Sequence, residues 1–421
     1  MRPSSASTLR DYRLRVVKTM VGGLAGLLAH RGITVFRANA AFHADETAPA
    51  TSNHIVHLVP SPDQSDILTY HKADVPEPSG PTMDLTATNI VIATGAKPRP
   101  LPGNPFAGAL IDSTQALEVN EFPSSAVIIG AGAIALEFAS MWNAAGSKVT
   151  LLIRKDRVLS AWDRRAGTTL TRELKRHGVN IITRASVTHV DTGANLGATV
   201  HYTCEGQDGE QSVWGEIALV AIGRDPITDP AWGVTIDDHG HVATDAYGRT
   251  DKPGVWAVGD VTAGHALAHR AFEQGIVIAE TIAGLNPKPV DEATVPQIVF
   301  SFPEAASVGL TVEQAQARED LIEIKETNYP MLANARMLMS GTAGSLTIVS
   351  GCDAANPDTP RVLGVHMVSQ MASDIIAEAE QLVGNHVPLA DAARLVHPHP
   401  TFSETLGEAL LKADGRPLHT R

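Results

Sequence analysis

The segment that begins at Ala126, AVIIGAGAIALEFASMWNAAGSKVTLLI, constrains the fold more than any other part of the sequence. It places a glycine-rich turn between an apolar strand and a helix, and a second strand follows. Gly130 permits the tight turn, Gly132 lets the backbone approach a pyrophosphate, and the small Ala135 allows the helix to pack closely on the strand. Phosphates bind the free N–H groups at such a helix N-terminus. Because all the parts occur in order, the segment predicts a dinucleotide-binding α/β unit instead of an isolated turn.

The end of the second strand bears on which nicotinamide dinucleotide binds. An NAD site usually has an acidic residue there, which binds the ribose 2′-hydroxyl. In this chain the strand ends in Ile153, Arg154 and Lys155. A guanidinium such as that of Arg154 pairs well with a 2′-phosphate, which favours NADPH. The alternative is a solvated basic turn, and the sequence leaves both interpretations open.

Two further strands indicate part of a second nucleotide site. One strand, at residues 90–93, ends at Thr94 and Gly95, and another, at residues 254–258, ends at Gly259 and Asp260. A carboxylate at the end of a strand can accept hydroxyl groups of a ribitol or a ribose. A helix is expected to begin near residues 266–269, and its positive end can stabilise the anionic edge of a reduced flavin.

The opening part of that second site has no counterpart in the sequence. Residues 12–29 have apolar positions at helical spacing, so Gly22, Gly23 and Gly26 lie inside a helix with no strand before it. No strand, GxGxxG turn and helix precede Ile90, although a βαβ unit takes about 30 residues or more. The sequence therefore predicts only half of a flavin site.

Near the C-terminus, the run HPHPTFSE from His397 to Glu404 is a candidate catalytic motif. Each histidine precedes a proline and is held extended, and Pro400 is expected at the first position of the next helix. Glu404 then lies in the early turns, where it can reach back to an imidazole. A carboxylate that orients a histidine makes a general base. A surface loop and a weak metal site are the alternatives, and the pattern identifies no definite metal ligands.

Composition excludes several classes of function. The 421 residues suffice for two to four domains, and the formal net charge of −13 argues against nucleic acid as a partner. No segment has the length and hydropathy of a membrane span. The two cysteines, Cys204 and Cys352, make no disulfide framework and fit a reducing cytoplasm.

Taken together, these segments resemble the FAD-dependent pyridine nucleotide–disulfide oxidoreductases over nearly the whole chain. IVIATGAKPRPLPG is similar to the exit from the family's flavin domain, GVWAVGD to its second flavin motif, and VPQIVFSFPEAASVGLT to the start of its dimerisation domain. Within the family, ALAHRAFEQGIVIAETIAG, RVLGVHMVSQMASDIIAEA and HPHPTFSETLGEA most resemble the dihydrolipoamide dehydrogenases.

The resemblance implies an α/β fold with two Rossmann-like nucleotide-binding domains, the first incomplete, and a C-terminal α+β dimerisation domain. The expected parts are a partial FAD-binding domain at 1–121, an NAD(P)-binding domain at 122–244, a return segment at 245–291 that completes the FAD domain, and an interface domain at 292–421. His399 is the expected base and Glu404 its orienting carboxylate. The expected cofactor-binding residues are Gly130, Ala131, Gly132, Ala133, Ile134, Glu137, Arg154, Val187 and Gly223 for the nicotinamide cofactor, and Thr94, Gly95, Asp260, Ala268 and His269 for FAD.

The function that the resemblance implies is oxidation of protein-bound dihydrolipoamide by NAD+, through FAD and a redox disulfide. The expected state is a homodimer, and the expected partners are the lipoyl domains of 2-oxo acid dehydrogenase or glycine cleavage complexes. Two departures favour other interpretations. Arg154 favours an NADPH-dependent reductase of a small disulfide or a metal ion. The lack of a Cys-x4-Cys pair and of the opening flavin unit favours an inactive nucleotide-binding or dimerising protein. We interpret the lack of both features as a truncation at the N-terminus.

Overall fold

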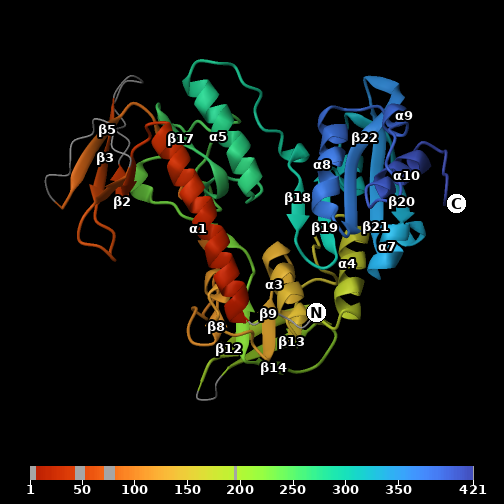
Figure 1. Cartoon of the computed structure of the whole chain (residues 1–421), viewed down its shortest axis with the longest axis horizontal. Helices are drawn as coiled ribbons and strands as arrows, with labels where there is room; N and C mark the ends of the chain where they lie inside the picture. The colour runs from red at the N-terminus through yellow and green to blue at the C-terminus, as the bar shows by residue number, and fades with distance from the viewer. Residues whose placement is uncertain (1–5, 43–52, 71–80, 194–196, 421) are drawn as a thin grey trace. The chain divides into compact units, whose positions relative to one another are not determined.

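The computed structural model describes residues 6–42, 53–70, 81–193 and 197–420, and these form two compact units (Figure 1). The larger unit contains Pro98–Gly223 and Asp291–Arg421, and the smaller unit contains the described residues up to Lys97 together with Arg224–Val290. Residues 98–121, expected above in the FAD-binding domain, therefore group with the nicotinamide sheet because β8 pairs with β15. Residues 224–244 group with the smaller unit.

The nicotinamide part of the larger unit is a five-stranded sheet in the order β11-β10-β9-β15-β8. All its described pairings are parallel. Its strands and helices are β8 (Leu110–Ile111), α2 (Ser113–Leu117), β9 (Ser125–Ile129), α3 (Ala133–Ala144), β10 (Lys148–Leu152), α4 (Arg164–Arg176), β11 (Asn180–Ile182) and β15 (Ile217–Val220). The predicted unit of strand, glycine turn, helix and strand is thus confirmed.

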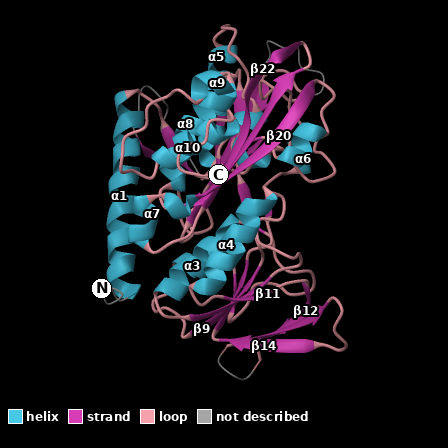
Figure 2. Ribbon diagram, turned by 90° about the vertical axis from the view of Figure 1, so that its right-hand side faces the viewer, coloured by secondary structure: helices cyan, strands magenta, loops and turns pink. Residues whose placement is uncertain are grey.

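The two faces of this sheet bury different partners because side chains alternate along each strand. On β9, Ala126 and Ile128 belong to a core with α3 and α4 that includes the fully buried Trp142. Val127 and Ile129 point the other way, into a core shared with an antiparallel sheet. That sheet comprises β12 (Ala185–Asp191), β13 (Ala198–Cys204) and β14 (Gln211–Gly215). Figure 2 shows α3 and α4 on one side of the parallel strands, with β12 and β14 on the other.

The C-terminal part of the larger unit is a five-stranded antiparallel sheet in the order β18-β19-β22-β21-β20. Its strands are β18 (Gln297–Val299), β19 (Glu304–Gly309), β20 (Leu321–Pro330), β21 (Ser345–Asp353) and β22 (Asn356–Ser369). Its helices are η3 (Glu292–Thr294), α6 (Val312–Gln316), η4 (Met331–Ala333), α7 (Ala335–Ser340), α8 (Ala372–Gly384), α9 (Leu389–Ala392) and α10 (Glu404–Ala413). Leu346, Ile348, Ile376 and Leu406 are among the buried residues that join the sheet to α8 and α10. This α+β arrangement is the one expected.

The smaller unit carries the candidate flavin-binding segments. Its elements are α1 (Ala6–His30), β1 (Val35–Arg37), β2 (Asn39–Phe42), β3 (His54–Val59), β4 (Leu68–Tyr70), β5 (Met83–Ala87), β6 (Ile90–Ile92), β7 (Ala96–Pro98), β16 (Arg224–Pro226), η1 (Pro230–Trp232), β17 (Val255–Ala257), η2 (Gly259–Val261) and α5 (Ala268–Ile282). β6 and β17 pair in parallel, and their core includes Ile92, Trp232 and Val255. None of the described helices, α1 included, is both long enough and apolar enough to cross a membrane.

Candidate active site and nucleotide sites

The two residues expected to form the base lie in contact. His399 Nδ1 is 2.6 Å from Glu404 Oε2. The imidazole is 76% exposed, whereas the Glu404 side chain is 15% exposed. Among the described residues, the ring has no hydrogen bond besides the one to Glu404. Nδ1–H therefore donates to the carboxylate, and Nε2 faces solvent with a lone pair that can accept a proton.

Glu404 is itself held in place from two directions. Asn334, which is 3% exposed, donates from Nδ2 to Glu404 Oε1 at 2.8 Å and to the Thr401 carbonyl at 2.9 Å. Glu404 is also the first residue of α10, where the helix N-terminus stabilises a negative charge. Pro400 was expected at this helical position; that prediction is wrong, because residues 400–403 form a turn in which Thr401 Oγ1 accepts the Glu404 N–H. Both oxygens of the carboxylate therefore have partners, which fixes the His399 ring.

The other histidine of the motif has a different environment. His397 Nε2 is 2.8 Å from Glu378 Oε1, and Nδ1 is 3.2 Å from the Leu395 carbonyl oxygen. Both neighbours are hydrogen-bond acceptors, and the hydrogen bond to Glu378 raises the pKa of His397. Its side chain is 9% exposed. Both ring nitrogens of His397 thus have partners within the protein, whereas Nε2 of His399 has none among the described residues.

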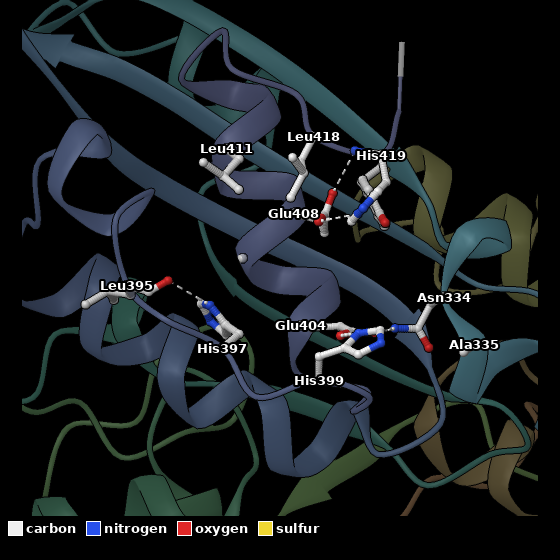
Figure 3. Close-up of a pocket in the computed structure, with 12 residues that line it drawn as sticks. Asn334, Ala335, Leu395, His397, His399, Glu404, Glu408, Leu411, Leu418 and His419 are labelled. Atoms are coloured by element: carbon white, nitrogen blue, oxygen red, sulfur yellow. Dashed lines mark hydrogen bonds and ion pairs between the residues drawn. The ribbon is translucent and has the colours of Figure 1, made fainter.

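A cavity of about 520 Å³ opens beside His399 (Figure 3). Its walls come from β20, the start of α7, α10 and the C-terminal segment, and they include Tyr329, Asn334, Leu411 and His419. Burial, together with the charges of Glu408 and Glu404, raises the pKa of Tyr329 to about 12. The phenol therefore stays neutral near pH 7 and does not compete with His399 for a proton. In Figure 3 the His399 ring points toward Glu404 and Asn334, and His419 pairs separately with Glu408.

The His397–Glu378 pair predicts a pH dependence of stability. Folding raises the pKa of His397. The stabilisation that the His397–Glu378 pair gives the folded state is therefore complete below the unfolded-state pKa of about 6.5, and it is lost as the pH rises through the folded-state pKa. Glu378→Gln is therefore expected to lower the free energy of unfolding by about 1.5 kcal/mol at pH 6, and by less at pH 9. Urea unfolding of both proteins at the two pH values measures this. An equal loss at both would show that the imidazole does not titrate in this range.

The glycine-rich turn has the geometry that a nicotinamide dinucleotide requires. Gly130 has φ of 138°, and a Cβ atom built there would lie 2.1 Å from the Ala221 carbonyl oxygen. Gly132 caps α3 without any side-chain hydrogen bond, and a Cβ atom built on it meets no atom within 4 Å. The first N–H groups of α3 have no intrahelical acceptor. The turn thus offers open space beside free N–H donors, which fits a pyrophosphate, and contacts of Ala131, Ala133 and Ile134 with the cofactor stay a prediction.

The other residues expected at the nicotinamide site have varied surroundings. Gly223 follows β15, and Gly130 follows the neighbouring β9, so both lie at the carboxyl edge of the sheet. Glu137 accepts the Phe300 N–H at 3.0 Å, and burial raises the pKa of Glu137. This carboxylate therefore contacts the C-terminal part of the unit. Val187 lies on β12 and packs against the core between the two sheets. A role of these residues in binding the cofactor stays a prediction.

Arg154 follows the buried Ile153 at the end of β10 and is exposed. Among the described residues, its guanidinium has no hydrogen bond or ion pair. Arg154→Ala is therefore expected to weaken NADPH binding about tenfold, since a charged hydrogen bond is worth about 1.5 kcal/mol or more. Fluorescence titration of wild type and variant with NADPH and NADH measures this, with the neighbouring Lys155→Ala as control. If NADH binds tighter to the wild type and the substitution leaves NADPH binding unchanged, Arg154 is only a surface charge.

The residues expected to bind FAD lie in the smaller unit. Thr94 and Gly95 follow β6, and Asp260 follows its parallel partner β17, so they share one edge of the strand pair. Thr94 Oγ1 donates to the Ile227 carbonyl, and Asp260 is half-buried. α5 begins at Ala268, close to where it was predicted, with His269 next to it. The described part of this unit contains no strand, GxGxxG turn and helix in succession, so it offers no cradle for the pyrophosphate of FAD, and the role of these residues at the flavin end stays a prediction.

Comparison with known proteins identifies the family. The sequence profile described as "Pyridine nucleotide-disulphide oxidoreductase" matches residues 2–275, and the profile of that family's dimerisation domain matches residues 295–410. The chain belongs to this family. A dihydrolipoyl dehydrogenase of Cupriavidus necator is 38% identical over 341 residues, which cover 80% of this chain and 70% of the relative. One of Geobacillus stearothermophilus is 31% identical over 416 residues, which cover 98% of this chain and 81% of the relative.

Solved structures of the family have the same fold. LpdA from Mycobacterium tuberculosis matches with a TM-score of 0.82 at 24% identity, over 98% of this chain and 84% of that protein. The HOCl-induced flavoprotein disulfide reductase RclA from Escherichia coli, in its Cu(II) complex, matches with a TM-score of 0.71 at 25% identity, over 89% of this chain and 77% of that protein. Pyridine nucleotide–disulfide oxidoreductases use FAD and NAD(P), and the chain is accordingly an oxidoreductase that acts on sulfur groups.

Sequence reasoning missed Asn334, which holds the Glu404 carboxylate beside His399. An Asn directly before the helical run ARMLMS is a recognisable N-cap, and Asn334 Oδ1 does accept the Met337 N–H. Nothing in the local sequence indicates that its amide N–H groups bind Glu404, 70 residues later.

Proposed function

We propose that this chain oxidises a dihydrolipoyl dithiol with a nicotinamide dinucleotide as electron acceptor, and that His399 is the base that deprotonates the dithiol. The observation that carries the proposal is the 2.6 Å contact from His399 Nδ1 to Glu404 Oε2, with the opposite side of the ring exposed beside the cavity. The names of the relatives support the substrate class.

The chemistry follows from the donors and acceptors around His399. A thiol S–H transfers its proton to Nε2, and the electron pair of the broken S–H bond stays on sulfur as a thiolate. Nδ1–H continues to donate to Glu404, whose negative charge stabilises the imidazolium that forms. Asn334 holds the second carboxylate oxygen, so the ring does not turn away when it becomes charged. The thiolate is the nucleophile in thiol–disulfide exchange, so the base raises the reactive fraction of substrate.

The turn at Gly130–Ile134 would hold the nicotinamide dinucleotide. For FAD the described residues are incomplete, because they supply no cradle for its pyrophosphate, and no step is derived through it. The two cysteines of the chain are both buried and unpaired, on β13 and β21, and we assign neither of them to the dithiol reaction. Buried free thiols agree with a cytoplasmic location.

The proposed partners follow from the dimerisation domain and from the exposure of the base. The dimerisation domain supports a homodimer. The His399 side chain is 76% exposed, so a dithiol carried on a lipoyl domain can reach it. We therefore propose that the lipoyl domains of 2-oxo acid dehydrogenase or glycine cleavage complexes are the physiological partners.

A second candidate is an NADPH-dependent reductase of a small disulfide, which the exposed Arg154 favours. The two functions are separated by assaying the enzyme expressed from its own chromosomal locus, so that any segment encoded upstream is present. Oxidation of dihydrolipoamide by NAD+ is expected to exceed NADPH-dependent reduction of glutathione disulfide. The reverse order would establish the second candidate. Loss of both activities would contradict the proposal and favour an inactive nucleotide-binding protein.

A further inference from the structure

A cluster of two histidines and two carboxylates lies far along the chain from the HPHP motif, on the antiparallel sheet of the nicotinamide part. His189 on β12 pairs directly across the ladder with His201 on β13. Val200, Tyr202 and Cys204 of β13 point into the core, so His201 points to the opposite, outer face. The register of β12 shifts between Val187 and His189, and the extra residue, Thr188, brings its hydroxyl beside the Glu210 carboxylate.

The four side chains have an ordered arrangement. The two imidazole rings stack with centroids 4.1 Å apart and planes 8° from parallel. Their Nδ1 atoms both face Glu210, at 3.8 Å from Oε1 for His189 and 3.7 Å from Oε2 for His201. Their Nε2 atoms both face Asp191 Oδ2, at 3.9 Å and 3.1 Å respectively. One carboxylate thus lies at each edge of the ring pair.

This arrangement fits a divalent transition-metal ion. The ligand atoms of His189, His201 and Glu210 lie within 4.8 Å of one another. Bonds of about 2.0–2.1 Å to Zn²⁺ place tetrahedral ligands about 3.3 Å apart. Because the rings are parallel, both must turn about their Cβ–Cγ bonds for the two Nδ1 lone pairs to converge on one ion. Two imidazoles with a carboxylate suit Zn²⁺, Cu²⁺ or Ni²⁺ better than Mg²⁺ or Ca²⁺. With neutral rings the four side chains carry two negative charges, which attract a cation.

Asp191 and Thr188 complete the arrangement. When Asp191 accepts a hydrogen bond from His201 Nε2–H, the lone pair of the His201 ring is on Nδ1, on the side of Glu210; carboxylates commonly orient metal-binding histidines in this way. Thr188 Oγ1 donates to Glu210 Oε1 at 2.7 Å and lies 3.2 Å from His189 Nδ1. In the absence of an ion, Nδ1–H of His189 can donate to this hydroxyl, so the ion replaces a proton there.

We propose that His189, His201 and Glu210 bind one Zn²⁺-like ion, with Asp191 as the positioning carboxylate. All four side chains are at least 23% exposed, so an ion can reach them from solvent. The ion would join β12, β13 and the residue that precedes β14, and would stabilise the nicotinamide part, since a ligand that binds the folded state alone shifts the unfolding equilibrium.

Calorimetric titration of the EDTA-treated chain with ZnCl₂ tests this proposal. Wild type is expected to bind one equivalent more than the double variant His189→Ala/His201→Ala, whatever other sites bind zinc. Asp191→Asn should weaken the site about 10- to 100-fold. His57→Ala is the matched control, because His57 is an exposed strand histidine that pairs with a carboxylate, Asp84, at 2.6 Å without a second imidazole. It should bind zinc as wild type does.

Thermal unfolding separates binding from folding defects. In EDTA the variants should unfold at the wild-type temperature, because the altered side chains are on the solvent face. Zinc should raise the midpoint of wild type and His57→Ala, and should raise that of Glu210→Gln and the double variant less. Equal stoichiometry and equal zinc-induced shifts in wild type and the double variant would overturn the proposal, as would a wild type that binds no zinc.

Discussion

Replacing Gly130 by alanine is expected to lower the free energy of unfolding by about 3 kcal/mol and to abolish nicotinamide nucleotide binding. The backbone at Gly130 has φ of 138°, which an L side chain rarely adopts, and the new methyl would lie 2.1 Å from the Ala221 carbonyl oxygen. Neither backbone can easily move, because β9 and β15 pair in parallel immediately before these residues. Urea unfolding and fluorescence titration with NADH and NADPH measure the two effects.

Gly132→Ala is the matched control for this prediction. Its φ is −91°, and a Cβ atom there meets no protein atom within 4 Å. The free energy of unfolding of Gly132→Ala should therefore differ from that of wild type by less than about 1 kcal/mol. Nucleotide binding should still weaken, because the methyl occupies the space through which the pyrophosphate approaches the N–H groups of α3. Normal binding by Gly132→Ala would show that the pyrophosphate does not lie on this turn.

The second large effect is expected at His399. In the enzyme expressed from its own locus, His399→Gln should lower kcat/KM for dihydrolipoamide by about 10²–10⁴, the usual contribution of a positioned general base. Glu404→Gln should lower kcat/KM by a smaller factor, since the imidazole remains and loses only its orienting carboxylate. His419→Gln is the control from the same cavity, because His419 pairs with Glu408 and not with Glu404. A loss in His419→Gln as large as in His399→Gln would mean that the cavity's shape is what matters.

Local patterns in the sequence were enough to predict much of the fold. The turn at Gly130 was recognisable because strand, glycines and helix are consecutive and each part has a physical requirement. β20 was not predicted, because its register shifts between Ile322 and Lys325 and Glu323 has φ of 52°. Such a bulge breaks the two-residue alternation by which a strand is recognised. β22 begins at Asn356, and its first residues are polar and mostly exposed, so the apolar residues that mark a buried strand start only later in the element.

In the candidate site, too, the contacts within one segment could be predicted from the sequence, and the contacts between distant segments could not. His399 and Glu404 are five residues apart, so their contact could be expected from one segment. Tyr329 on β20 and Asn334 at the start of α7 reach the same cavity, and only the packing of the C-terminal sheet against α10 brings them there. His189 and His201 pair across two strands, and Glu210 joins them from the chain before a third. No fixed spacing in the sequence reveals a cluster of this kind, because strand register and a bulge determine it.

The most direct test of the role of His399 is the ratio of two rates in the His399→Gln enzyme. One is the oxidation of dihydrolipoamide by NAD+, which requires deprotonation of a thiol. The other is the reduction of a dye by NADH, which does not. The base assignment predicts that the first rate falls by about 10²–10⁴ while the second stays close to that of wild type. If both rates fall together by the same factor, His399 supports the structure of the enzyme, and the assignment of His399 as the base is wrong.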